Sequence, residues 1–172
     1  MDTDHLRFPI GQWKKPLAFD IKNIRAQINA IEHFPSRLNE KVNSFTALQL
    51  EQTYRPGGWT ALQVIHHCSD SHMNAFIRFK LALTENNPTI KPYAESKWAE
   101  LPDAKSFPAT HSVQLLEALH ARWTVLLKSL DDAQWQLSFI HPEHNGELRL
   151  YETVSLYGWH CEHHFAHLGL IK

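Results

Sequence analysis

The chain has 172 residues, of which 43% are hydrophobic and 20% charged, and its formal net charge is −1 when histidine is neutral. This composition is typical of a soluble globular domain with a sizeable core, so we interpret residues 1–172 as a single domain. The near-zero charge argues against a general attraction to nucleic acid or to an anionic membrane surface, and no apolar stretch approaches the ~20 residues of a membrane-spanning helix.

The two cysteines, Cys68 and Cys161, are too few for a disulfide framework, and each lies beside a histidine in a segment with a helical pattern. The N-terminus lacks the basic region and apolar run of a signal peptide. Both features favour a reduced protein of the cytoplasm.

Residues 1–16 contain two prolines and a glycine, which predict an extended arm. Apolar residues three and four apart then predict a first helix over residues 21–45. Pro35 falls inside this helix. Because proline removes a backbone donor and clashes with the preceding turn, we expect a kink or a break there.

A second helix is predicted over residues 61–83, directly after a Pro-Gly-Gly turn. Thr60 and Gln63 have the spacing of a capping box at its start. Residues 88–110 contain four prolines and little periodicity. We interpret this segment as a long crossover, with a helical turn near residues 95–101.

A third helix is predicted over residues 112–130, followed by a short helix through Trp135. Next, the segment "LSFIHPEHNGELRLYE" indicates a β-hairpin that turns at Asn145 and Gly146. A fourth long helix begins near Thr153. Together these elements predict an all-α fold, a four-helix bundle with a long crossover and a small hairpin before the last helix.

The last helix contains the segment "WHCEHHFAHL", with four histidines. At about 100° per residue they share one helix face, and neighbours one turn apart have Cβ atoms roughly 5–6 Å apart, which lets two imidazoles reach one metal ion. Isolated histidines on an apolar helix are more often ordinary core or surface residues. Four unpaired imidazoles inside a bundle would be costly, however, and a metal ion or a cleft would relieve that cost.

A third ligand would have to come from another helix, and the second helix offers three histidines. His72 lies on the apolar face, where a core role suits it as well as a ligand role. His67 shares a polar stripe with Asn74 and Arg78, which could face solvent or line a site. His66 lies near an ordinary surface edge. The helical wheel alone leaves the choice open.

The chain resembles the YfiT-like proteins of the DinB superfamily, which comprise metal-dependent hydrolases and bacillithiol transferases. The resemblance spans nearly the whole chain through the stretches "FPIGQW", "YRPGGWT", "VIHHCSDSHMNAFIRFKLALTE", "IKPYAESKWAEL", "LHARWTVLL", "FIHPE" and "LYGWHCEHHFAHL". It implies a four-helix bundle, usually dimeric, with one divalent cation per chain, zinc or nickel being favoured. Carried over position by position, the metal ligands are His67, His160 and His164. Cys68 and Glu162 replace the leucine and histidine common in the family.

A site of three neutral imidazoles leaves the full charge of the cation for its open positions, where a water or a thiol can be ionised. No glutamate follows His160 as in HExxH enzymes, and Glu162 points away from the histidine face. The missing base favours a thiol S-transferase that joins a small-molecule thiol to an electrophilic substrate, with Asn74 and Arg78 holding an anionic cosubstrate.

Two alternatives remain open. One is a metal-dependent hydrolase, and the other is a non-catalytic metal-binding protein whose site is closed by His163 or His167.

Overall fold

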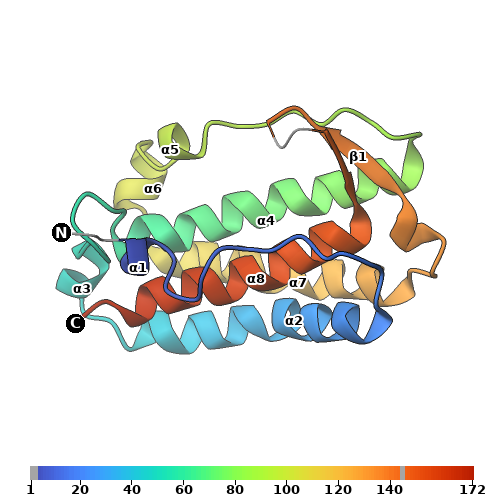
Figure 1. Cartoon of the computed structure of the whole chain (residues 1–172). Coiled ribbons are helices and arrows are strands. Elements are labelled where there is room, and N and C mark those ends of the chain that lie inside the picture. The colour runs from blue at the N-terminus through green and yellow to red at the C-terminus, as the bar shows by residue number, and fades with distance from the viewer. Residues whose placement is uncertain (1–3, 144–145) are drawn as a thin grey trace.

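The computed structural model describes residues 4–143 and 146–172. Four long helices form its body, namely α2 (Ile21–Asn43), α4 (Ala61–Thr84), α7 (Ala109–Ser129) and α8 (Leu150–Gly169). Helices α2 and α4 each pack against both α7 and α8, so the four helices enclose one core (Figure 1). The predicted all-α four-helix bundle is confirmed.

The long crossover follows from the directions of the helices. Helices α4 and α7 run the same way along the bundle, and α2 and α8 run the opposite way (Figure 1). The chain must therefore return along the whole bundle between α4 and α7. It does so through α5 (Glu95–Trp98) and α6 (Pro102–Ser106), and the predicted helical turn coincides with α5.

We expected a kink or a break at Pro35, and the break is absent, because helix α2 continues without interruption through this residue. Its apolar face is fully buried against the other helices, and this packing outweighs the local cost of the proline. The carbonyl oxygen of Ile31, which Pro35 cannot bond, instead accepts a hydrogen bond from His120 Nδ1 at 2.6 Å. A contact from α7 thus satisfies the group that the proline leaves free.

The N-terminal arm is only partly extended. It begins with the short helix α1 (Asp4–Arg7) and then runs along α8 (Figure 1). The indole N–H of Trp159 donates to the Gly11 carbonyl at 3.2 Å, and that of Trp13 donates to Ser155 Oγ at 3.4 Å. The arm therefore covers the helix that carries the histidine-rich segment.

The loop between α2 and α4 contains a short helix, α3 (Ala47–Glu51), which the sequence did not indicate. It begins with a capping box formed by Thr46 and Gln49. The predicted box at the start of α4 is also present, since Thr60 Oγ1 accepts from the Gln63 backbone N–H at 3.1 Å and the Gln63 amide oxygen accepts from the Thr60 N–H. This cap sets the start of the helix that carries His67.

The predicted hairpin lies between α7 and α8. The chain passes through a 3₁₀ turn, η1 (Gln134–Gln136), and then forms β1 (Ser138–His141) and β2 (Gly146–Arg149), which pair antiparallel. Asn145 of the predicted turn lies outside the described residues. The backbone of Gly146 has a φ of 126°, which only glycine adopts without strain.

The core lies between the four helices and is built from large apolar side chains. Fully buried examples are Ile31, Phe34, Phe79, Leu116 and Trp123. Both cysteines are free thiols inside it. None of the described helices has the length and hydropathy that a membrane crossing requires.

Candidate metal centre

Three histidines from two helices converge where α4 faces α8. The ligand nitrogens of His67, His160 and His164 all lie within 4.8 Å of one another. His67 Nε2 and His160 Nε2 are 3.3 Å apart. With zinc–nitrogen bonds of 2.0–2.1 Å, adjacent ligands of a tetrahedral site are separated by about 3.3–3.4 Å. The structure therefore brings the three predicted ligands to a spacing that suits one divalent cation.

The electrostatics of this histidine triad also suit a metal. Burial lowers the pKa of His67 to about 4, and burial together with the neighbouring imidazoles lowers the pKa values of His160 and His164 well below the usual value. The rings are therefore neutral near pH 7, and each offers a lone pair. No carboxylate belongs to the triad, so a bound cation would keep its full charge.

His72 lies behind the triad rather than in it. It is completely buried, and its Nε2 is 3.0 Å from His160 Nδ1. Its other nitrogen is 2.7 Å from Nε2 of His120, a residue to which the sequence assigned no role. Burial lowers the pKa of both rings, that of His120 to about 4. The helical register could have revealed His120, which follows the buried Leu116 by one turn.

His163 and His167 form a second cluster that shares His164, and the ligand atoms of these three also lie within 4.8 Å of one another. His167 Nδ1 is 3.3 Å from His164 Nδ1. His163 stacks on Trp159 with ring centroids 4.2 Å apart, and its Nδ1 is buried with no hydrogen-bond partner among the described residues. The two candidates for a fourth ligand thus adjoin the triad on α8.

His66 points away from the triad. It is buried, not at a surface edge, and its ring nitrogens contact Ser112 Oγ at 2.7 Å and the Phe107 carbonyl at 2.9 Å. His66 therefore connects α4 to the crossover and to α7, which is a structural role. A helical wheel of α4 cannot show this role, because both partners come from segments distant in the sequence.

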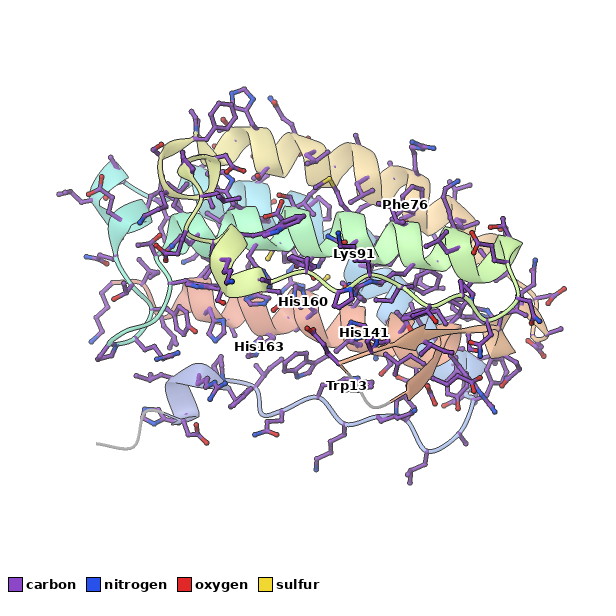
Figure 2. The ribbon with its side chains drawn as sticks, turned by 90° about the horizontal axis from the view of Figure 1, so that it is seen from above. Trp13, Phe76, Lys91, His141, His160 and His163 are labelled. Carbon is purple, nitrogen blue, oxygen red and sulfur yellow. The ribbon has the colours of Figure 1, made fainter. Side chains whose placement is uncertain are left out.

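A cavity of about 360 Å³ opens onto the triad. The N-terminal arm, the loop before α4, the crossover and the hairpin all contribute to its wall. Figure 2 shows His141, from the hairpin, and His163 around His160 in this region. Other polar side chains of the wall include Ser71, Arg78, Glu95, Glu143 and Tyr157. The three neutral imidazoles therefore face a polar chamber that can admit a small molecule.

Arg78 and Asn74 have different positions relative to this cavity. Arg78 lines it, with only 9% of its surface exposed, and forms no salt bridge with any described carboxylate. Asn74 is not part of the lining, and its amide donates to the Asp70 backbone carbonyl at 2.9 Å. The structure thus brings Arg78, but not Asn74, to the chamber beside the triad.

The sequence placed only one of the carboxylates of this region. Glu162 forms a two-point ion pair with Arg37 and lies away from the triad, as the helical wheel indicated. Glu95 and Glu143 line the cavity, but they come from the crossover and the hairpin. Irregular segments carry no periodicity, so only the folded chain shows which of their residues face the site.

Known proteins resemble this chain over almost its entire length. Relatives from Bacillus cereus strain 03BB102 and from Bacillus thuringiensis subsp. konkukian are each 50% identical over 169 residues, which is 97% of this chain and 95% of the relative. Both are named "Putative metal-dependent hydrolase".

A solved structure has the same fold. YfiT from Bacillus subtilis, described as a probable metal-dependent hydrolase with an unusual four-helix bundle topology, superimposes with a TM-score of 0.93 at 43% identity. The match covers 96% of this chain and 94% of YfiT. The family model of the DinB superfamily matches residues 30–168, a span that contains all three histidines of the triad. The chain therefore belongs to the DinB superfamily.

Proposed function

We propose that this chain is a metal-dependent enzyme in which His67, His160 and His164 hold one divalent cation, zinc or nickel, and which transfers a small anionic thiol to an electrophile. The observation that carries the proposal is the convergence of three neutral imidazoles on a chamber that also contains the buried guanidinium of Arg78. A cation bound there would supply Lewis-acid chemistry that ionises a thiol or a water.

Arg78 is the residue that we assign to the anionic cosubstrate. Arg78 forms no salt bridge with a described carboxylate, but Glu95 is close enough to feel its charge: burial raises the pKa of the Glu95 carboxyl, and Arg78 opposes that rise. The buried guanidinium is therefore only partly compensated, and an anionic ligand would supply further negative charge. Tyr157, whose pKa is raised by burial, stays protonated and donates to the Ser71 carbonyl at 3.2 Å, so it forms a rigid neutral wall beside Arg78. A thiol that carries a carboxylate matches this charge pattern.

The lack of a free carboxylate base in the histidine-rich segment favours transfer over hydrolysis. Hydrolysis needs a group that removes a proton from the attacking water, and the one acidic residue within the histidine-rich segment, Glu162, is paired with Arg37. One observation favours the alternative, a hydrolase, which also agrees with the names of the relatives. Glu95 and Glu143 line the same chamber, and either carboxylate could accept that proton.

We also propose that the protein is a homodimer and that it is located in the cytoplasm. Two free, buried thiols support a reducing compartment.

The test is a conjugation assay with tag-free, zinc- or nickel-loaded protein, a carboxylate-bearing thiol such as bacillithiol, and monochlorobimane. We expect conjugation well above the uncatalysed rate, abolished in His160→Ala and retained in His33→Ala, which changes an exposed histidine outside the triad. A loaded enzyme that conjugates no cellular thiol would contradict transfer.

The roles of the charged residues are tested in the same assay. Arg78→Gln should raise the KM for bacillithiol about 10–100-fold, because a charge-assisted hydrogen bond contributes about 1.5–3 kcal/mol, and should scarcely affect the uncharged thiol 2-mercaptoethanol. Glu95→Gln and Glu143→Gln should leave transfer nearly unchanged. A large loss of activity in either variant would favour hydrolysis instead.

A further inference from the structure

A chain of hydrogen-bonded rings leads from α7 through α4 to His160. The His120 Nδ1 faces the Ile31 carbonyl oxygen at 2.6 Å, and because a carbonyl only accepts, this nitrogen carries the proton. The neutral ring then accepts at Nε2 from His72 Nδ1, 2.7 Å away. His72 Nε2 is left to accept from His160 Nδ1 at 3.0 Å. His160 therefore keeps an unprotonated Nε2 on the side that faces His67.

A second chain of the same kind ends on His164. His167 Nε2 lies 3.1 Å from the carbonyl oxygen of Arg7 and must donate to it. Its Nδ1 therefore accepts, and the atom facing it at 3.3 Å is Nδ1 of His164. His164 then donates from Nδ1 and keeps its lone pair on Nε2. His160 and His164 thus reach the same tautomer by independent routes.

Each of these two series of hydrogen bonds runs between a triad histidine and a backbone carbonyl. Both carbonyls lack the usual helical hydrogen-bond partner. In α2 the Ile31 carbonyl would normally bond to the N–H of residue 35, but Pro35 has none. Arg7 is the last residue of the four-residue helix α1, where carbonyls have no partner within the helix. Each carbonyl is therefore free to accept from an imidazole N–H. Because a carbonyl can only accept, it determines which nitrogen donates in every other hydrogen bond of the same series.

We propose that these two histidine relays hold the rings of His160 and His164 so that both present Nε2 to the cation, and that His72, His120 and His167 are positioning residues of the metal site. The inference rests on the metal site proposed above. Metal-binding histidines usually donate their second N–H to a carboxylate, a carbonyl or water. Here a neutral imidazole takes that place, so the ligand orientation is fixed without adding a negative charge beside the cation.

The Nδ1 atoms of His164 and His167 are 3.3 Å apart, and a second cation held by His163, His164 and His167 would also explain this short distance. The cation would then lie between the two Nδ1 atoms. It would require a lone pair on both nitrogens of His164 if the triad were also occupied, and hence an imidazolate. A single proton between His164 and His167 satisfies the contact without removing one from His164. The number of zinc ions bound per chain separates the two arrangements.

Tautomers in the metal-free protein provide the first test. Two-bond ¹H–¹⁵N correlation spectra of ¹⁵N-labelled protein at pH 7.5, assigned with single-histidine variants, should show the Nδ1–H form for His72, His120, His160 and His164, and the Nε2–H form for His167. Detection of His160 or His164 as the Nε2–H form would overturn the corresponding relay, whatever the enzyme catalyses.

Zinc affinity, measured by competition with a chromophoric chelator, provides the second test. His72→Leu and His167→Leu should each weaken zinc binding about 10–100-fold, the usual effect of losing the partner of a metal ligand. His72→Gln should recover part of the loss, because its amide can accept from His160 and donate to His120. The matched control is His66→Leu, which changes a buried histidine of the same helix whose ring nitrogens contact Ser112 and Phe107, and it should bind zinc as the unaltered chain does.

The results of these zinc-binding measurements distinguish a failure of the two histidine relays from a failure of the proposed metal site. A wild-type chain that binds neither zinc nor nickel would overturn the metal site and the relays with it. Zinc binding that is unchanged in both leucine variants would overturn the relays alone, and two zinc ions per chain would overturn the second relay.

Pro35→Ala tests the anchor of the first relay. The alanine supplies a backbone N–H that competes for the Ile31 carbonyl, so zinc binding should weaken several-fold although the substitution favours the helix. The loss should be smaller than in His72→Leu, because a carbonyl oxygen can accept two hydrogen bonds. Unchanged zinc affinity in Pro35→Ala would contradict the part assigned to the proline.

Discussion

The histidines of this chain look alike in the sequence, but they have different roles in the structure. The role of each depends on which atoms its two ring nitrogens contact. His66 and His67 are neighbours on α4, yet His66 contacts a serine and a carbonyl, while His67 faces His160 of the triad. His160 differs from both, because its Nδ1 contacts another imidazole, that of His72. The residue type thus makes a metal site chemically feasible, and the partner of each ring decides which nitrogen is available to bind.

Asp70, on the same helix, has its pKa shifted by burial in the opposite direction from the histidines, because a carboxyl is neutral when protonated and an imidazole is neutral when deprotonated. Burial and the negative charge of Asp103 raise its pKa from 3.8 to about 6. Since the folded state then binds the proton more strongly than the unfolded state, stability falls as the pH rises from about 4 to about 6 and stays reduced above it.

We therefore predict that Asp70→Asn raises the free energy of unfolding at pH 7.5 by about 1 kcal/mol, a figure that allows for solvent screening of this half-buried group. The gain should shrink as the pH falls through 6 toward 4. Urea unfolding of both proteins at several pH values measures it. The exposed Asp132→Asn serves as control, and a gain that is the same at every pH would be inconsistent with this explanation.

Helix α8, which carries two of the triad histidines, packs closely against α2. The side chains at this contact set the distance between the two helices. Gly158 lies on α8 where Gln27 of α2 crosses it. A Cβ atom at Gly158 would be 2.0 Å from the Gln27 amide oxygen and 3.0 Å from the Gln27 Cβ. The flexible end of the glutamine can move, but its Cβ cannot move without the helix.

Gly158→Ala should therefore lower the free energy of unfolding by about 1–3 kcal/mol, as overpacking commonly does. Combining it with Gln27→Ala should restore part of the loss, because the amide is removed and the Cβ remains. The control is Gly169→Ala at the C-terminal end of α8, where an added Cβ meets nothing within 4 Å. Equal stability of the two single variants in urea unfolding would show that the helices can separate at no cost.

At the scale of the whole molecule, the bundle and the metal site are coupled. The triad joins α4 to α8, and its three nitrogens are brought together only when these helices pack. A cation that binds this arrangement, and not the unfolded chain, stabilises the fold by mass action.

At free zinc about 100 times its dissociation constant, we expect a stabilisation of about 2.7 kcal/mol, which raises the Tm on the order of 5–10 °C for a chain of this length. Calorimetry with zinc and after chelation measures the shift. His160→Ala should lose most of it, and His33→Ala should retain it. A Tm that does not respond to zinc or nickel would argue against a site formed by folding.

The sequence by itself determined the features that depend on neighbours along the chain. The periodicity of residues 21–45 and 61–83 predicted two of the long helices, and Thr60 with Gln63 predicted where one of them begins. The same 3.6-residue period placed four histidines on one face of α8, which indicated a metal site before any fold was known. These signals are local, so they can be read without knowing which helices touch.

Only the tertiary structure decided the features that depend on contacts between distant segments. The helix containing Pro35 stays continuous because packing and the bond from His120 compensate for the proline. Arg78 faces the chamber and Asn74 does not, although both lie on the polar stripe of one helix. Such choices depend on which side chains from other helices and loops occupy the same space, and the pattern along a single helix does not contain that information.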